Sequence, residues 1–195
     1  MKKNDQHAPA EAPGLYVHVP FCRTKCPYCG FYSVTSSGSE RRWLDALARE
    51  AERYRGLFAA FDTLYVGGGT PSSLEEADVS RLAGDLRRTF LFTEGAEATI
   101  EANPDDVTAA RLGLWRDLGF TRLSLGVQSF DDAVLQRLGR RHDARAARCA
   151  VELARAAGFD NVGIDLIYGV DAQPPGSWER TIDEAVEHAP EHISC

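Results

Sequence analysis

The chain has 195 residues, of which 44% are hydrophobic and 26% charged, and these ordinary proportions exclude a disordered or fibrous protein. With 22 Lys and Arg against 29 Asp and Glu, the formal net charge is −7, which makes nucleic acid a poor candidate for the main partner. The sequence contains no apolar run of about 18 residues, so we expect no membrane span and a cytoplasmic location.

Short β-rich runs alternate with longer amphipathic runs after a polar stretch, residues 1–13, that is expected to be a flexible lead. Strands are predicted over Leu15–Val19, Thr63–Val66, Ala98–Ala102, Arg122–Val127 and Val162–Ile167, and a further one begins near Ile193. Helices are predicted over Glu40–Tyr54, Glu75–Phe90, Ala109–Leu118, Asp132–Leu138, Ala144–Ala157 and Trp178–His188. Ser72 or Ser73 is the expected cap of the second helix.

This alternation is typical of a parallel sheet with right-handed crossovers. It is compatible with a doubly wound sheet and with a complete or partial βα barrel. Because the chain stops inside a strand, we expect residues 14–195 to be one incomplete domain, without a further C-terminal domain.

Three of the five cysteines, Cys22, Cys26 and Cys29, lie in a C-x3-C-x2-C loop after the first strand. Three thiolates from one short loop can bind three irons of a cubane cluster, which leaves the fourth iron open to a small molecule. The alternative is a structural zinc ion, for which His18 is the nearest fourth ligand. Cys149, in the middle of a predicted helix, is expected to be a small core residue.

Polar or glycine residues follow the other strands, at the rim where carboxyl ends of parallel strands meet. The run Gly67-Gly68-Gly69-Thr70 lets the backbone approach a ligand closely. Further candidates are Glu101, Gln128, Asp165 and Arg140, whose guanidinium suits a carboxylate. Three of these residues also have an alternative interpretation. Glu101 could be a solvated acid at the rim, Asp165 could form a buried ion pair, and Arg141 could make the ligand contact instead of Arg140.

With these motifs in place, the sequence resembles the radical S-adenosylmethionine (radical SAM) superfamily from about residue 14 to its end. Within that superfamily it is most similar to the group of oxygen-independent coproporphyrinogen III oxidase and the HemW haem chaperone. The resemblance implies a partial (β/α)6 radical SAM barrel that stops at the start of the sixth strand. It also implies a [4Fe-4S] cluster whose unique iron binds the amino and carboxylate groups of SAM. One electron from that cluster then cleaves SAM to methionine and a 5′-deoxyadenosyl radical.

The resemblance assigns the cluster to Cys22, Cys26 and Cys29. It predicts contacts to SAM from the residues at the matching motif positions, Tyr16, Gly68, Gly69, Thr70, Glu101, Gln128, Arg140 and Asp165. Tyr28 is added as a SAM contact because its aromatic ring, inside the cysteine loop, is expected to pack near the adenine. No catalytic residue is assigned beyond these.

Two functions remain within the group. The oxidase type has a further cysteine two positions after the third, where this chain has Phe31, and it has a longer arm before the first strand. Both differences favour a HemW-type chaperone that transfers haem to a recipient protein. Its haem motif lies beyond this chain, so we expect haem to bind only the full-length protein. Porphyrinogen is the alternative substrate, and the electron donor and recipient stay unidentified. A non-catalytic, zinc-stapled interaction domain is the alternative from another class.

Overall fold

The computed structural model describes residues 12–35 and 38–195. Its strands are β1 (Gly14–Val19), β2 (Phe61–Gly68), β3 (Phe92–Ala102), β4 (Arg122–Gln128), β5 (Asn161–Leu166) and β6 (His192–Ser194). Its α-helices are α1 (Glu40–Tyr54), α2 (Glu76–Thr89), α3 (Ala109–Asp117), α4 (Asp132–Arg137), α5 (Ala144–Ala156) and α6 (Ser177–Glu187). Two 3-10 turns, η1 (Pro71–Ser73) and η2 (Pro104–Asp106), follow β2 and β3.

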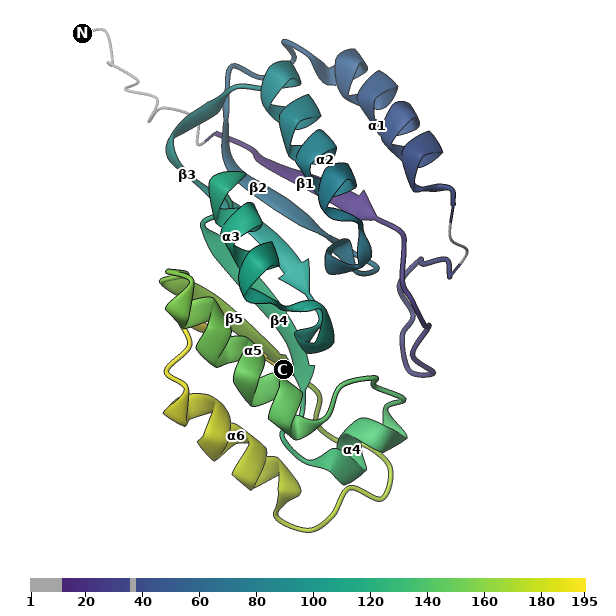
Figure 1. Cartoon of the computed structure of the whole chain (residues 1–195), viewed down its shortest axis with the longest axis vertical. Coiled ribbons are helices and arrows are strands. Elements are labelled where there is room, and N and C mark those ends of the chain that lie inside the picture. Colours follow the sequence, from purple (N-terminus) through teal and green to yellow (C-terminus); the bar gives the residue numbers. More distant parts are fainter. Residues whose placement is uncertain (1–11, 36–37) are drawn as a thin grey trace, which may run out of the picture.

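The six strands form one parallel sheet whose spatial order is the order of the chain, β1 to β6. A doubly wound sheet reverses its strand order near the middle, so the sequential order excludes that alternative. In Figure 1 the helices lie over one face of the sheet, as in the wall of a βα barrel. The predicted α/β fold, a partial (β/α)6 barrel, is therefore confirmed.

The core lies between the sheet and the helices, because alternate side chains of each strand point to that side. In β1, Val17 and Val19 are buried, whereas the alternate residues Tyr16 and His18 are not. The opposite, concave face instead carries polar side chains near the ends of the strands. They include Tyr65 of β2, Glu101 of β3, Ser124 of β4 and Asp165 of β5.

Every predicted strand and helix is present, and the differences lie at their ends. The largest is in β3, which begins at Phe92 instead of Ala98. The predicted cap of α2 was wrong, because the N-cap is Glu75 and the two serines belong to the preceding turn η1. Their hydroxyls are taken up elsewhere, since Ser72 donates to Asp106 and Ser73 to the carbonyl of Thr70.

Cys149 corrects another prediction, because its side chain is exposed and not part of the core. The buried stripe of α5 is formed by Ala144, Ala147, Ala150, Val151 and Ala154, and Cys149 lies outside it. The lead predicted over residues 1–13 falls outside the described residues, except for Ala12 and Pro13. No helix in the described ranges combines the length and apolarity that crossing a bilayer requires.

Candidate functional site

A cavity of about 430 Å³ opens at the carboxyl ends of the strands. It brings together eleven of the twelve residues predicted for the site, although they come from distant parts of the chain. They are Cys22, Cys26, Tyr28, Cys29, Gly68, Gly69, Thr70, Glu101, Gln128, Arg140 and Asp165. The convergence follows from the topology, because parallel strands in sequential order present all their carboxyl ends at one edge.

The cysteine loop leaves β1 and is closed at its base by backbone hydrogen bonds. The amide of Cys22 donates to the carbonyl of Val34 at 3.0 Å, and Val34 donates to Pro20 at 2.7 Å. Within the loop, Cys29 donates its amide to the carbonyl of Cys26 at 3.1 Å. All three cysteine side chains are partly exposed and line the cavity, so their thiols are open to a ligand.

The thiols do not converge on a point that would suit one metal ion. Across residues 12–35 and 38–195, no three His, Cys, Asp or Glu side chains are grouped as ligands of a single ion. Both ring nitrogens of His18 already have hydrogen-bond partners, since Nε2 lies 2.9 Å from the carbonyl oxygen of Tyr32 and Nδ1 lies 3.1 Å from the hydroxyl of Tyr16. Three thiols from one loop match the ligand count of a cubane, in which each thiolate binds a different iron.

Two side chains already donate hydrogen bonds to the sulfurs. The hydroxyl of Thr70 lies 3.4 Å from Sγ of Cys22, and Nη1 of Arg140 lies 3.7 Å from Sγ of Cys26. Hydrogen bonds to ligand sulfurs are one of the means by which a protein orients and tunes an iron–sulfur site.

The glycine run after β2 is held against the cysteine loop without room for side chains. Gly69 donates its amide to the carbonyl of Val19 at 2.7 Å, and a Cβ at Gly69 would lie 2.7 Å from the carbonyl oxygen of Phe21. Gly68 has φ +115°, and a Cβ there would meet the ring of His18 at 2.5 Å. A tight turn alone needs one glycine, whereas here close approach and positive φ demand glycine at successive positions.

Glu101 is half-buried at the end of β3, and both carboxylate oxygens have partners. Oε1 accepts from the hydroxyl of Tyr65 at 2.7 Å, and Oε2 accepts from the amide of Gly68 at 3.0 Å. Burial raises the pKa of Tyr65, and the charge of Glu101 raises it further. Tyr65 was not among the site residues predicted from the sequence. Its signal was the alternation in β2 that puts Tyr65 on the same face as Gly67.

Asp165 lies on β5, on the same concave face. Its Oδ2 accepts from the hydroxyl of Ser124, a β4 residue that the sequence analysis also missed, at 3.2 Å. Burial raises the pKa of Asp165, and the negative charge of Glu101 adds to the effect, while Ser124 and Arg122 oppose it. The two carboxyl groups therefore make an acidic side of the cavity, suited to an ammonium group or to hydroxyls.

Arg140, in the loop between α4 and α5, crosses the cavity wall. Its Nη2 donates to Oδ1 of Asn103 and, at 2.8 Å, to the carbonyl of Gly126. Its Nη1 lies 3.5 Å from the hydroxyl of Tyr28 and also reaches Cys26. Burial raises the pKa of Tyr28 to about 12 against the opposing charge of Arg140. The Nε of Arg140 is buried without a hydrogen-bond partner in the described part of the chain.

Gln128 and Tyr16 complete the predicted set, but only Gln128 lines the cavity. Gln128 has φ +68°, unusual for a residue other than glycine, at a register shift between β4 and β5. Tyr16 borders a second cavity, of about 470 Å³, between β1 and α1. Its ring stacks on Tyr65 with 6.0 Å between ring centroids, and its hydroxyl lies 3.1 Å from Nδ1 of His18, so Tyr16 borders the site through these neighbours.

Comparison with known proteins relates this chain to one family. The model of the radical SAM superfamily matches residues 16–185. The heme chaperone HemW of Mycobacterium tuberculosis is 38% identical over 97% of this chain and 53% of its own length. The oxygen-independent coproporphyrinogen III oxidase of Escherichia coli is 37% identical over 95% of this chain and 42% of its own length. The chain thus spans about half the length of the curated relatives it matches.

Solved structures agree with the sequence comparison. Coproporphyrinogen III oxidase (HemN) from Escherichia coli superposes with a TM-score of 0.85 at 36% identity, covering 94% of this chain and 44% of that chain. Methylornithine synthase superposes with a TM-score of 0.66 at 14% identity, over 94% of this chain and 52% of that chain, which shows a shared fold alone.

Proposed function

This chain belongs to the radical SAM superfamily, and from that premise we propose that Cys22, Cys26 and Cys29 bind a [4Fe-4S] cluster whose fourth iron takes SAM. The observation that carries the proposal is the single cavity lined by the three cysteines and by the polar ends of β2 to β5. The donor set fits the group, because three thiols serve three irons and leave one coordination corner free.

When bound, the reduced cluster would supply the electron that cleaves SAM reductively, which is chemistry of the cofactors and not of a side chain. The chain's own residues bind and orient. Thr70 and Arg140 donate hydrogen bonds to the cysteine sulfurs. Glu101 and Asp165 offer carboxylate oxygens to an ammonium or hydroxyl group of the nucleotide. The remaining proposed contacts are Tyr16, Tyr28, Gly68, Gly69 and Gln128.

We further propose that the whole protein is a HemW-type haem chaperone, with residues 14–195 as its radical SAM core. Phe31 supports this choice, because it stands where the oxidase type has its additional cysteine. It is 70% exposed beside the cavity. The similarity to HemN favours the second candidate, an oxygen-independent coproporphyrinogen III oxidase. Haem, its recipient protein, an electron donor and a cytoplasmic location are proposals for the whole protein.

Anaerobic reconstitution with iron and sulfide tests the cofactor assignment. We expect about four irons and four sulfides per chain, a broad visible absorption that bleaches on reduction, and an electron paramagnetic resonance (EPR) signal that changes when SAM is added. A colourless protein that holds one zinc ion per chain would overturn the cluster and support the interaction domain. An iron–sulfur signal that SAM leaves unchanged would overturn the open iron site.

Chaperone and oxidase are separated with the full-length protein. Stable binding of haem together with failure to consume coproporphyrinogen III supports the chaperone. Turnover of coproporphyrinogen III by the reduced, SAM-loaded protein would instead establish the oxidase.

A further inference from the structure

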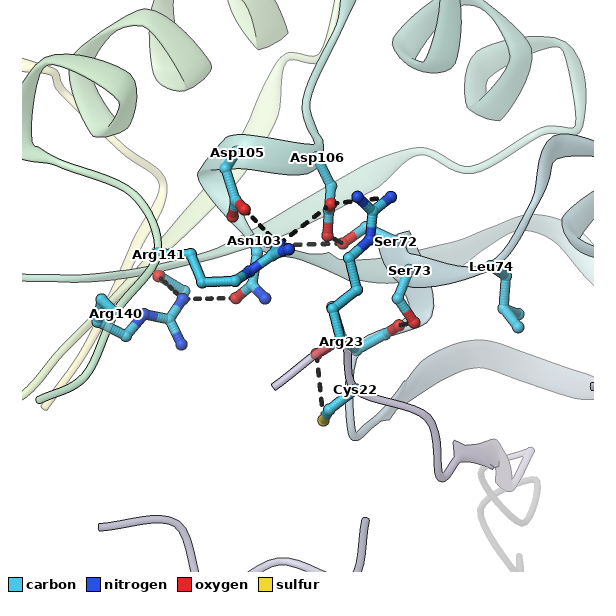
Figure 2. A network of polar contacts seen from close by, with 12 residues as sticks. Cys22, Arg23, Ser72, Ser73, Leu74, Asn103, Asp105, Asp106, Arg140 and Arg141 are labelled. Carbon is cyan, nitrogen blue, oxygen red and sulfur yellow. Dashed lines mark hydrogen bonds and ion pairs between the residues drawn. The ribbon is translucent and has the colours of Figure 1, made fainter. Parts of the chain in front are cut away.

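Asp106, the last residue of η2, is a buried carboxylate outside the cavity lining. Its side chain is 0% exposed. The hydroxyl of Ser72 donates to Oδ2 at 2.9 Å, and Nη2 atoms of Arg23 and Arg141 each lie 3.4 Å from Oδ1. Figure 2 shows these groups meeting at the Asp106 carboxylate. A buried carboxylate is costly unless it is paired in this way, so its surroundings are built to hold the charge.

The partners of Asp106 belong to the loops that build the cavity. Arg23 is in the cysteine loop, between Cys22 and Cys26. Ser72 is in η1, directly after the glycine run, and it also accepts the amide of Asn103 at 3.0 Å. Arg141 adjoins Arg140 in the loop before α5. One carboxylate therefore joins the cysteine loop, η1 and the Arg140 segment to η2.

The two arginines depend on Asp106 to different degrees. Arg141 also pairs with Asp105, so it keeps a carboxylate partner if Asp106 is lost. Arg23 is 49% exposed, and within the described residues its ion pair is to Asp106 alone. Loss of the Asp106 charge therefore acts mainly on Arg23 and, through it, on the cysteine loop.

We propose that Asp106 is a positioning residue that holds the cysteine loop through Arg23, with its thiols toward the cavity. Its value for cofactor binding rests on the proposed function, in which those thiols bind a cluster. The contacts from Asp106 to Arg23 and Ser72 are features of the structure and do not depend on that function. Residues that support metal ligands in this indirect way are commonly worth about 10-fold or more in metal affinity.

The test compares Asp106→Asn, Arg23→Gln, the double variant and Arg23→Lys in this chain. The first readout is the rate of iodoacetamide alkylation at Cys26 in the cluster-free chain, resolved by peptide mass, with the exposed Cys149 as internal reference. The second is the rate at which a chelator removes iron from the reconstituted cluster. Asp45→Asn, which breaks an exposed ion pair to Arg81 between α1 and α2, is the matched control.

We expect both rates to rise about 10-fold in Asp106→Asn and in Arg23→Gln. The double variant should match either single variant, because both changes remove the same connection. Arg23→Lys should restore most of the wild-type behaviour, and Asp45→Asn should change neither rate. Wild-type rates in Asp106→Asn, or multiplied effects in the double variant, would overturn the inference.

A variant that does not fold and a chain that assembles no cluster can both be distinguished from failure of this inference. If Asp106→Asn does not fold, Arg23→Gln decides the question, since its half-exposed side chain can be replaced without burying a new group. If the wild-type chain assembles no cluster, the proposed function fails, whereas the alkylation rates still decide whether Asp106 holds the loop.

Discussion

The phenol of Tyr65 donates a 2.7 Å hydrogen bond to Oε1 of Glu101 and so joins β2 to β3 beside the cavity at the carboxyl ends of the strands. The same carboxylate accepts the amide of Gly68, where the glycine run begins to turn away from β2. Glu101 is thus oriented by two donors from the neighbouring strand, one of which can be removed by a single substitution.

Tyr65→Phe should destabilise the chain because it takes away a hydrogen bond to a charged group and leaves the ring in place. We expect a loss of about 1.5 kcal/mol in the free energy of unfolding. For a chain of this size this lowers the melting temperature by about 3–6 °C. The melting temperature is measured by thermal unfolding monitored with circular dichroism. Tyr54→Phe, at a half-exposed position on α1, is the control and should change little. Equal stability of the two variants would contradict the role of the Tyr65 hydroxyl.

Gly69→Ala should be destabilising for a steric reason. Its Cβ would lie 2.7 Å from the carbonyl oxygen of Phe21 and 2.9 Å from that of Val19, so the backbone of the cysteine loop must move. We expect a cost of about 1–3 kcal/mol in urea unfolding.

Gly113→Ala is the matched control for that substitution. Gly113 lies inside α3, and a Cβ there meets nothing within 4 Å. Alanine is the better helix former, so this variant should gain up to about 1 kcal/mol. The prediction fails if the two alanine variants shift stability in the same direction.

His142 makes the stability of the chain depend on pH. Burial lowers its pKa to about 4, and the charge of Arg140 contributes, while its Nε2 lies 3.0 Å from the carbonyl oxygen of Val127. Between about pH 6.5 and pH 4 the unfolded chain binds a proton that the native chain does not. The native state therefore loses stability as the pH falls through this range, by about 3 kcal/mol in total.

His142→Gln should flatten this dependence, since glutamine keeps an N–H donor for Val127 but does not titrate. Urea unfolding at several pH values from 7 to 5 measures the effect. The slope should decrease by up to about 1.4 kcal/mol per pH unit relative to the wild-type chain. An unchanged slope would show that His142 accepts its proton as readily in the native state as in the unfolded chain.

The three loop cysteines should each be necessary for the cluster, because each thiolate binds a different iron. Serine at Cys22, Cys26 or Cys29 should abolish most of the visible absorption and iron content after anaerobic reconstitution. Cys149→Ser should leave both unchanged, since its exposed side chain lies on α5, away from the cavity lining. Dependence of the chromophore on Cys149 would contradict the assignment of ligands.

Local patterns along the chain predicted most of the fold. The bounds of α1 agree with its apolar periodicity at both ends, and the end of α5 agrees with Gly158, which has φ +84°. These features depend on neighbours in sequence, and such neighbours determine helical periodicity, strand alternation and turn conformation. The motifs of the cavity were predictable for a related reason, since each follows a strand and parallel strands end at one edge.

The partners across the cavity were not predictable in this way. Ser72 looked like a helix cap, but its hydroxyl bonds to Asp106 on another loop. Arg140 and Arg141 are adjacent in sequence, and nothing in the sequence distinguishes their roles. In the structure, Arg140 contacts the sulfur of Cys26, 114 residues away, while Arg141 pairs with Asp105 and Asp106. Hydrogen bonds and ion pairs act over a few ångströms, so their partners are determined by how separate strands and loops pack in space. The spacing of residues along the chain does not predict that packing.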